Sequence, residues 1–458
     1  SLQPKLNSMF GYDKAKKEFN DYFANREEVK TNEYTNIFKD KNVLVIHAES
    51  MQRNVIGLEF NGQEVSPTLN RLSKEGMYFS NYFSQVSVGT SSDAELTFST
   101  SLMPTKSGTA FVSYPNRTYN SIQKLLSEKG YYTFCMHANN ADFWNRRTMY
   151  KSLGYQNFYS KKDYIVTDDT TIGLGLSDEE FFTQSIPKLK QINEEHENWY
   201  GTMIMLSNHT PFSDVDKYGD FAVDIKETIT NEDGTTEEVT YQYMEGTKLG
   251  NYFKSYHYAD GALGEFIEKL DENGLLDNTV LVIYGDHDAR LSRSDYNRLY
   301  NYDKENNKTL DRDDPNYKDY DSYQYELGRK VPFIIWTKDM AGTKYNQEIT
   351  EVMGMYDAMP TLGNMLGIYN EYQLGHDISN VLGKNIVCFP NGNWVTNKAY
   401  YNSQKVEYLS LNDEAISEEE IKYNTEYTNK LLDVSNNIIV FNLLAEDSDT
   451  EKILKEVE

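Results

Sequence analysis

Apolar runs of strand length alternate with helix-like segments along most of this chain, and this alternation limits the fold more than any other feature. Residues 42–47 form a short apolar run bounded by polar residues, which is typical of a buried strand. The next segment predicts a helix, with Ser66 as its N-cap, Pro67 in its first turn and Gly76 at its end. Strands that alternate with helices favour an α/β fold with a mostly parallel central sheet sandwiched by helices.

The same alternation continues toward the C-terminus. We predict further strands at residues 131–137, 202–206, 279–284 and 331–336. We predict further helices at residues 121–128, 257–272 and 355–366. Two regions depart from the pattern. A turn at residues 231–234 predicts an exposed hairpin of strands 225–230 and 235–241, and the polar stretch 290–328 predicts a long surface excursion.

The charge of the chain limits its partners. It carries 45 Lys and Arg against 71 Asp and Glu among 458 residues, a formal net charge of −26, and the basic residues are scattered. So acidic a surface repels anionic lipid headgroups and nucleic acid, and we expect no nucleic-acid partner. An anionic substrate would need a local positive group, and a metal ion is a candidate for it.

Cysteine content and hydropathy limit the class of protein further. Cys135 and Cys388 are too few for a disulfide framework or a cysteine-rich structural zinc site. No apolar run reaches the about 18 residues of a membrane-spanning helix, and the chain begins with Ser1 rather than methionine. We therefore expect a soluble fragment or processed product, with any membrane anchor upstream of Ser1.

Possible metal ligands stand where two predicted strands end. The strand at 42–47 runs into Glu49, and the strand at 279–284 runs into Asp286 and His287. Parallel sheets present functional groups at the carboxyl ends of their strands. Carboxylates and imidazoles are hard or borderline metal ligands, so both strand ends are candidates for one metal site.

A hydroxyl residue, Ser91, lies between these two strand ends in the sequence and just ahead of the helix-like segment 96–102. The dipole and free N–H groups of a helix N-terminus favour an alkoxide and an incoming phosphate. Taken singly, a Gly-Asp-His turn or a Thr-Ser-Ser-Asp cluster is also typical of ordinary turns and N-caps. Together, the order Glu49, Ser91 and the Asp286–His287 pair matches one metal-site plan.

Two further segments could line the same site. His209 follows the predicted strand 202–206, although a lone histidine is also common as a hydrogen-bonding filler. Trp144 and Arg146 join an aromatic surface to a guanidinium that suits bidentate phosphate binding; a surface arginine beside a half-buried tryptophan is the structural alternative. The Ser91 segment lacks the Cys-x-Pro-x-Arg signal for formylglycine, so we do not expect a formylglycine sulfatase.

From about residue 40 to 405 the chain resembles the extracellular domain of the lipoteichoic acid synthase family, within the alkaline phosphatase/sulfatase superfamily. These enzymes polymerise glycerol phosphate in Gram-positive bacteria. The resemblance is carried by Val-Leu-Val-Ile-His-Ala-Glu49-Ser-Met-Gln, Gly89-Thr-Ser91-Ser-Asp93-Ala-Glu95, Phe143-Trp-Asn-Arg146, Asn208-His209-Thr-Pro-Phe, Tyr284-Gly-Asp286-His287, Asp357-Ala-Met-Pro-Thr-Leu and Phe389-Pro-Asn-Gly-Asn-Trp. The Phe-Trp-Asn-Arg and Asn-His-x-Pro-Phe motifs are the more specific to this branch.

The resemblance implies a role for each matching residue. One divalent metal, most often Mn2+ in the family, would be held by Glu49, Ser91, Asp286 and His287. Such ligands also suit Mg2+ and do not exclude Zn2+. The expected catalytic residues are the nucleophile Ser91, His209 and Arg146. The expected substrate contacts are Trp144, Arg146, His209 and, close to them, His137 and Asn139.

The resemblance also implies a division of the chain into three parts. Residues 1–40 would be a helical lead-in from a membrane region outside this chain. Residues 41–370 would form the sulfatase-like catalytic domain. Residues 371–458 would form a small antiparallel sheet followed by an acidic helical tail.

Two positions depart from the family pattern. The synthases usually carry a threonine as nucleophile, whereas this chain has Ser91, which keeps the hydroxyl chemistry. At Asn139 the synthases usually have aspartate, a change that would affect the acceptor or the phosphoryl headgroup.

The expected activity is phosphoglycerol transfer from phosphatidylglycerol to a glycerol-phosphate polymer, through a covalent Ser91 intermediate. The expected location is the extracellular face of the plasma membrane in a Gram-positive envelope. The alternatives are a phosphoethanolamine transferase or phosphodiesterase of the same superfamily and, from another class, a non-catalytic domain that binds teichoic acid. The sequence predicts no oligomeric state.

Overall fold

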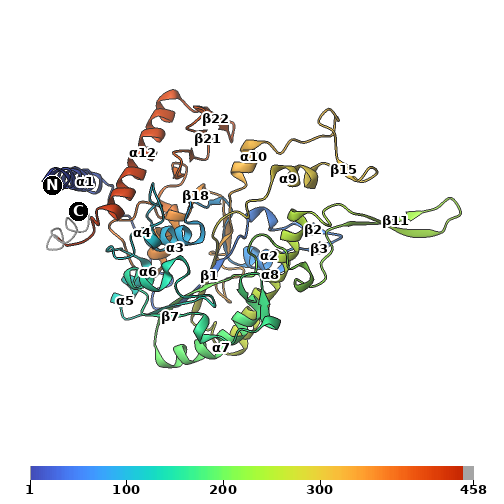
Figure 1. Ribbon diagram of the computed structural model, residues 1–458, viewed down its shortest axis with the longest axis horizontal. Helices are drawn as coiled ribbons and strands as arrows, with labels where there is room; N and C mark the ends of the chain where they lie inside the picture. Colours follow the sequence, from blue (N-terminus) through green and yellow to red (C-terminus); the bar gives the residue numbers. More distant parts are fainter. Residues whose placement is uncertain (1, 447–458) are drawn as a thin grey trace.

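The protein is described by a computed structural model over residues 2–446, and a central sheet organises it (Figure 1). The strands of this sheet follow the order β17-β4-β16-β13-β1-β10-β6-β7. Their bounds are β1 Asn42–Ala48, β4 Met77–Phe79, β6 Tyr132–Met136, β7 Asn157–Tyr159, β10 Trp199–Ile204, β13 Thr279–Gly285, β16 Phe333–Trp336 and β17 Gln347–Ile349.

The sheet is mostly parallel. Strand β1 pairs in parallel with both β10 and β13, and the pairs β10–β6, β6–β7 and β17–β4 are parallel as well. Only β16 runs against its two neighbours. Every residue of β1 is buried, as expected for a strand whose two faces are both covered. The predicted fold class is confirmed.

Two layers of helices cover the sheet. On one face, Leu44 and Ile46 of β1 share a core with α2 (Pro67–Glu75), α7 (Asp178–Glu195) and α8 (Lys248–Glu272). On the other face, Val43 and Val45 share a core with α3 (Thr90–Thr100), α5 (Ile122–Glu128) and α11 (Ala358–Leu366). Successive side chains of a strand point to opposite faces, so one apolar run supplies both cores.

A small antiparallel sheet follows the main domain, as predicted. It consists of β19 (Val387–Cys388), β20 (Trp394–Val395), β21 (Ala399–Asn402) and β22 (Glu407–Ser410). The helix α12 (Glu418–Val440) then packs against α1 (Leu2–Ala24), which brings the two ends of the described chain together (Figure 1). Tyr34 and Phe38 pack in the same core as β1. The three-part division of the chain stays a prediction.

Several predicted bounds differ from the structure. The predicted strand 202–206 lies at 199–204, and α8 begins at Lys248, nine residues before its predicted start. The first turns of α8 are rich in tyrosine, and the Tyr252 hydroxyl donates to the Ser50 carbonyl at 2.6 Å. Tyrosines buried in this way do not stand out as an apolar face in the sequence.

The polar region 290–328 contains more structure than predicted, because α9 (Arg293–Tyr300) and α10 (Ser322–Leu327) lie within it. The hairpin of β11 (Ile225–Thr230) and β12 (Thr236–Tyr241) projects from the molecule (Figure 1).

The remaining strands form short pairs: β2 Glu59–Phe60 with β3 Gln63–Glu64, β5 Tyr82–Phe83 with β18 Met353–Gly354, β8 Thr171–Ile172 with β9 Gly175–Leu176, and β14 Tyr302–Asp303 with β15 Lys308–Thr309. Within residues 2–446, none of the helices is long and apolar enough to span a membrane.

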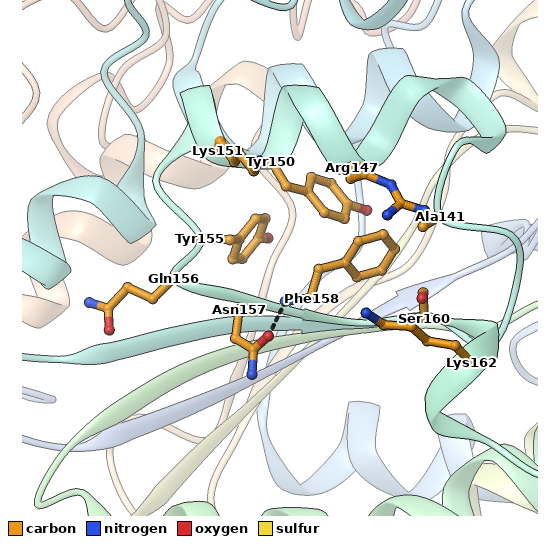
Figure 2. A pocket seen from close by; sticks show the side chains of 10 residues that line it. All are labelled: Ala141, Arg147, Tyr150, Lys151, Tyr155, Gln156, Asn157, Phe158, Ser160 and Lys162. Carbon is orange, nitrogen blue, oxygen red and sulfur yellow. Dashed lines mark hydrogen bonds between the residues drawn. The ribbon is translucent and has the colours of Figure 1, made fainter.

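A cavity of about 180 Å3 lies at the β7 edge of the sheet, between β7 and α6 (Arg146–Leu153) (Figure 2). The rings of Tyr150, Tyr155 and Phe158 pack edge to face in its wall, with Tyr150 about 5 Å from each of the other two. Arg147 and Lys162 also line it. The cavity therefore combines an aromatic wall with cationic side chains.

Candidate active site

The parallel pairing of β1 with β13 places two candidate ligands side by side. The register sets Ala48 opposite Gly285, so Glu49 and Asp286 leave the sheet at the same edge. The Asp286 carboxylate accepts a hydrogen bond from the Ser50 backbone N–H at 2.7 Å, which ties the two strand ends together. A Cβ at Gly285 would lie 2.4 Å from the Met51 carbonyl, so this close approach requires glycine.

A tight turn at the start of α3 positions Ser91 beside these two strand ends. Asp93 is buried, and its carboxylate accepts hydrogen bonds from the backbone N–H groups of Ser87 and Gly89, both at 3.0 Å. Thr90 has a φ of +42°, a left-handed conformation that is strained for a β-branched residue. Strained backbone of this kind clusters at functional sites.

The helix that carries Ser91 begins earlier than predicted. α3 starts at Thr90, so Ser91 lies inside the first turn rather than ahead of the helix. Every residue of α3 after Thr90 is buried, although Ser, Thr and Asp dominate its first turn. These residue types favour caps over helix interiors, so the sequence indicates a later start.

The four predicted metal ligands converge in the structure. Ser91 Oγ lies 3.0 Å from Glu49 Oε2, 2.8 Å from Asp286 Oδ2 and 3.3 Å from His287 Nε2. All four residues are buried. Hydroxyl, carboxylate and imidazole groups from three separate segments therefore meet at one point, which is the arrangement that the sequence predicts.

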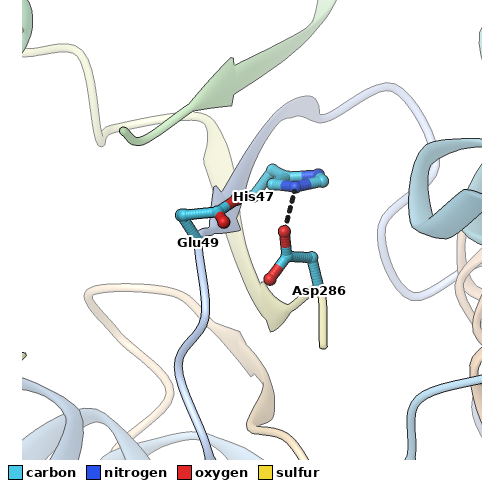
Figure 3. A group of neighbouring side chains, drawn as sticks. All are labelled: His47, Glu49 and Asp286. Carbon is cyan, nitrogen blue, oxygen red and sulfur yellow. Dashed lines mark hydrogen bonds and ion pairs between the residues drawn. The ribbon is translucent and has the colours of Figure 1, made fainter. Parts of the chain in front are cut away.

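A fifth group, His47, belongs to the same cluster and was not predicted. Its Nε2 lies 3.1 Å from Asp286 Oδ2, and its Nδ1 lies 2.6 Å from the Tyr284 hydroxyl. Figure 3 shows His47, Glu49 and Asp286 together; their ligand atoms lie within 4.8 Å of one another. His47 and Glu49 are two residues apart at the end of a strand, so their shared face is the signal that could have identified His47.

The two buried carboxylates differ in their affinity for protons. Burial, reinforced by the charge of Asp286, raises the pKa of Glu49 well above its usual range. Burial alone would also raise the pKa of Asp286, but His287 and His47 outweigh it and hold that pKa far below its usual range. Two adjacent buried carboxylates can both ionise only beside positive charge.

This donor set suits a divalent cation. Carboxylate oxygens of Glu49 and Asp286, the Ser91 hydroxyl and the His287 imidazole are hard or borderline ligands, as Mn2+ and Mg2+ prefer and Zn2+ accepts. A cation would also relieve the repulsion between the two carboxylates. The residues present therefore fit the divalent metal that the sequence predicts.

Arg146 of α6 is bound to the helix that carries Ser91, through its partner Glu95. Arg146 Nε donates to Glu95 Oε2 at 3.1 Å, and Tyr150 also donates to the Glu95 carboxylate. Glu95 follows Ser91 by four residues on α3, so both side chains lie on the same side of that helix. The Arg146 guanidinium is buried, and among the described residues its Nη1 has no hydrogen-bond partner. An unpaired buried donor of this kind suits an anionic ligand.

The loop before α6 presents Trp144 in an unusual backbone conformation. Trp144 and Asn145 both have a φ of +55°, in the left-handed region, and the Trp144 side chain is half-buried. Asn145 Nδ2 donates to the Phe111 carbonyl at 2.9 Å, which anchors the loop. Consecutive left-handed residues other than glycine are costly, and the anchored loop persists because its surroundings fix it.

Two predicted histidines border the cluster. Burial, with the nearby charge of Arg146, lowers the pKa of His137 well below its usual value, so this imidazole stays neutral. Its Nδ1 is 3.0 Å from the Ile204 carbonyl, which leaves Nε2 as an acceptor. His209 Nε2 lies 3.8 Å from Glu49 Oε1, and its side chain is about one third exposed.

Asn139 lies at the margin of this arrangement. Its backbone N–H donates to the His137 carbonyl at 2.8 Å, and its side chain accepts from the Asn140 N–H at 2.8 Å. No described hydrogen bond joins its side chain to the Ser91 cluster. The substrate roles of Asn139, His137, Trp144 and Arg146 stay predictions.

The fold and this cluster identify the class of protein. The family model for sulfatases matches residues 41–368, and the chain belongs to the sulfatase family. Within that family, the chain is similar to lipoteichoic acid synthases, as the motifs predict. It is 33% identical over 419 residues to lipoteichoic acid synthase 1 of Bacillus subtilis, covering 90% of this chain and 59% of that protein.

Two further comparisons also show similarity to lipoteichoic acid synthases. Lipoteichoic acid synthase of Staphylococcus aureus is 31% identical over 434 residues, which cover 91% of this chain and 60% of that protein. The chain thus spans about three fifths of the length of these curated relatives. The crystal structure of the lipoteichoic acid synthase LtaP from Listeria monocytogenes superposes with a TM-score of 0.75 at 29% identity, covering 92% of this chain and 98% of that one.

Proposed function

We propose that this protein is a metal-dependent phosphoglycerol transferase that moves glycerol phosphate from phosphatidylglycerol to a lipoteichoic-acid-type polymer through Ser91. The observation that carries the proposal is the contact of Ser91 Oγ with Glu49, Asp286 and His287, all within 3.3 Å. The similarity to lipoteichoic acid synthases supports the choice of substrate. The donor lipid places the reaction at a membrane, and we propose the outer face of the plasma membrane in a Gram-positive cell.

The metal in this proposal is one divalent cation, Mn2+ before Mg2+ or Zn2+, held by Glu49, Ser91, Asp286 and His287. When bound, it would neutralise the buried carboxylates and lower the pKa of the Ser91 hydroxyl. His47 holds Asp286 through its Nε2, so we assign it a positioning role.

In the first step, Ser91 Oγ, having released its proton to solvent, attacks the phosphorus of phosphatidylglycerol. An Oγ–P bond forms while the P–O bond to diacylglycerol breaks, and the diacylglycerol oxygen leaves with the electron pair. His209, which is partly exposed beside Glu49, gives that oxygen a proton. The unpaired Nη1 of Arg146 neutralises charge on the phosphoryl oxygens, and glycerol phosphate stays on Ser91.

In the second step, the terminal glycerol hydroxyl of the polymer attacks the same phosphorus. The hydroxyl proton passes to neutral His209, the Oγ–P bond breaks, and the electron pair returns to Ser91. The polymer grows by one glycerol phosphate and both side chains recover their starting states. Trp144, which is half-buried and precedes Arg146 by two residues, would contact the glycerol group.

The test compares two neighbouring serines. Ser91→Ala should lower the release of diacylglycerol from phosphatidylglycerol by at least about a thousandfold, because the attacking oxygen is removed. Ser92→Ala is the matched control: Ser92 Oγ donates to the Gly89 carbonyl at 2.7 Å, so this variant should stay within about tenfold of the parent protein. Normal turnover in Ser91→Ala would refute the assignment of the nucleophile.

The same assay separates the related activities. Phosphatidylglycerol and phosphatidylethanolamine are offered in turn, and the lipid that yields diacylglycerol identifies the headgroup. Release from phosphatidylethanolamine alone would replace the proposal with a phosphoethanolamine transferase. No release from either lipid, with metal bound, would favour a teichoic-acid-binding domain.

A further inference from the structure

Two segments that carry site residues lack the acidic excess of the chain. Residues 86–119 and 139–162, here called the rim segments, contain seven Lys and Arg against three acids. Over the whole chain the balance is 45 against 71. Two of the three acids, Asp93 and Glu95, are buried, and the third, Asp142, pairs with Arg147 at 3.0 Å. The rim segments therefore present almost no free negative charge.

The rim segments lie together around the candidate active site. One carries Ser91 and the short helix α4 (Ala110–Ser113), and the other carries Trp144 and Arg146. α4 packs against both α3 and the single turn Phe143–Asn145. The hydrogen bond from Asn145 Nδ2 to the Phe111 carbonyl joins the two segments directly.

Exposed apolar side chains occur on these segments beside the site. Val88 is 66% exposed and precedes Ser91 by three residues. Phe143 is 47% exposed and precedes Arg146 by three residues. Val112, on α4, is 56% exposed. Single exposed apolar residues are common on proteins, but the position of these three on the two joined rim segments beside one site indicates an interaction surface.

Cationic side chains accompany the apolar ones. Arg147, Lys151 and Lys162 line the cavity between α6 and β7, where Arg147 and Lys162 lie at the same end of the aromatic rings (Figure 2). Within the described part of the chain, neither Lys151 nor Lys162 forms an ion pair. Lys106 contributes less, because it pairs with Asp433 of α12.

We propose that the rim segments dock on the surface of an anionic phospholipid bilayer, with Val88, Val112 and Phe143 entering the headgroup region. Exposed apolar groups beside basic ones form the usual combination for binding such a surface. The rest of the chain is strongly acidic and is repelled by the same lipids, which favours approach of the bilayer by this face. The choice of a lipid partner rests on the proposed function, which requires buried Ser91 to reach a phosphate at the bilayer surface.

The binding test uses large vesicles of equal parts phosphatidylcholine and phosphatidylglycerol, with phosphatidylcholine vesicles as reference, in a chelator that prevents turnover. The protein should co-sediment with the anionic vesicles, and added salt should weaken binding. Val112→Glu and Lys162→Glu should each weaken binding about tenfold. Val406→Glu and Lys405→Glu, exposed in the turn between β21 and β22, are matched controls that should bind like the parent.

Turnover provides the second measurement. Val112→Glu should lower diacylglycerol release from vesicles about tenfold but leave release from a water-soluble short-chain phosphatidylglycerol unchanged, because Val112 is an exposed residue of α4 outside the Ser91 cluster. Equal melting temperatures of the variants exclude misfolding. Parental vesicle binding by both rim variants, or no preference of the parent for anionic vesicles, would overturn the docking surface. A parent that binds vesicles but cleaves neither lipid would instead overturn the proposed function alone.

Discussion

At the scale of single residues, the Glu95–Arg146 pair connects the nucleophile helix to the predicted phosphate pocket. Both side chains are buried, and the Glu95 carboxylate also accepts the Tyr150 hydroxyl. Desolvating two charges is costly, and we infer that this pair is kept because Arg146 has a further task. For Arg146 that task is the unpaired Nη1, which we assign to the phosphoryl oxygens.

This pairing predicts that the single and double variants differ strongly in their free energy of unfolding. Glu95→Leu should cost about 3–5 kcal/mol in the free energy of unfolding, because it leaves the buried Arg146 charge without a partner. Glu95→Leu combined with Arg146→Met should recover most of that loss, since neither charge then remains. Urea unfolding of the parent, both single variants and the double variant measures the coupling; losses that simply add would contradict the account.

At the scale of secondary-structure elements, buried carboxylates act as caps. Asp260 of α8 accepts hydrogen bonds from the N–H groups of Thr68 and Leu69, both at 2.9 Å, in the first turn of α2. A capping serine was predicted at Ser66, but its hydroxyl contacts Asn70 Oδ1 instead. The cap of α2 therefore comes from another helix, and it fixes α2 and α8 against each other.

The Asp260 cap predicts a pH dependence of stability. Burial raises the pKa of Asp260 to about 7, so the folded protein binds this proton more tightly than the unfolded chain. Its contribution is therefore largest at low pH and is lost as the pH rises toward 7. The parent should lose unfolding free energy as the pH rises from about 5 to 8. The Asp260→Asn variant should lose about 2–3 kcal/mol less over the same range.

Urea titrations of parent and variant at both pH values measure this difference. Asp303→Asn is a suitable control, because the Asp303 carboxylate lies in β14, accepts hydrogen bonds only from Asn306 among the hydrogen bonds described, and caps no helix. An Asp260→Asn protein that keeps the full parental slope would show that other groups cause the pH dependence.

At the scale of the whole molecule, the metal cluster joins elements from across the chain. Glu49 follows β1, Ser91 lies in the first turn of α3, and Asp286 and His287 follow β13. A cation held by all of them would bind the folded state and not the extended chain, so it would stabilise the fold as a whole. The net charge of −26 adds a general repulsion that bound cations reduce.

Removal of divalent metal should therefore lower the melting temperature by a few degrees, corresponding to about 2–4 kcal/mol at saturating metal. Calorimetry with a chelator, followed by Mn2+, Mg2+ or Zn2+, would rank the three ions. Asp286→Asn should respond to none of them at the concentrations that shift the parent. An unchanged melting temperature for the parent would exclude a tightly held cation.

Local patterns in the chain were sufficient to predict the α/β class, most strands of the central sheet and the strand ends that carry Glu49, Asp286 and His287. These features depend on residues close in sequence: side-chain periodicity, helix caps and turns. The partners of Ser91 could be proposed only because an acid, a hydroxyl and an Asp-His pair occur in an order that a known family shares.

The folded chain alone decided how these groups meet. Ser91 and Asp286 are 195 positions apart, and only the parallel register of β1 and β13 together with the Asp93 turn brings them within 2.8 Å. His47 joins the cluster, and Glu95 fixes Arg146, through contacts that no local pattern encodes. Neighbours in sequence determine which elements form, whereas packing between distant elements determines which side chains face each other.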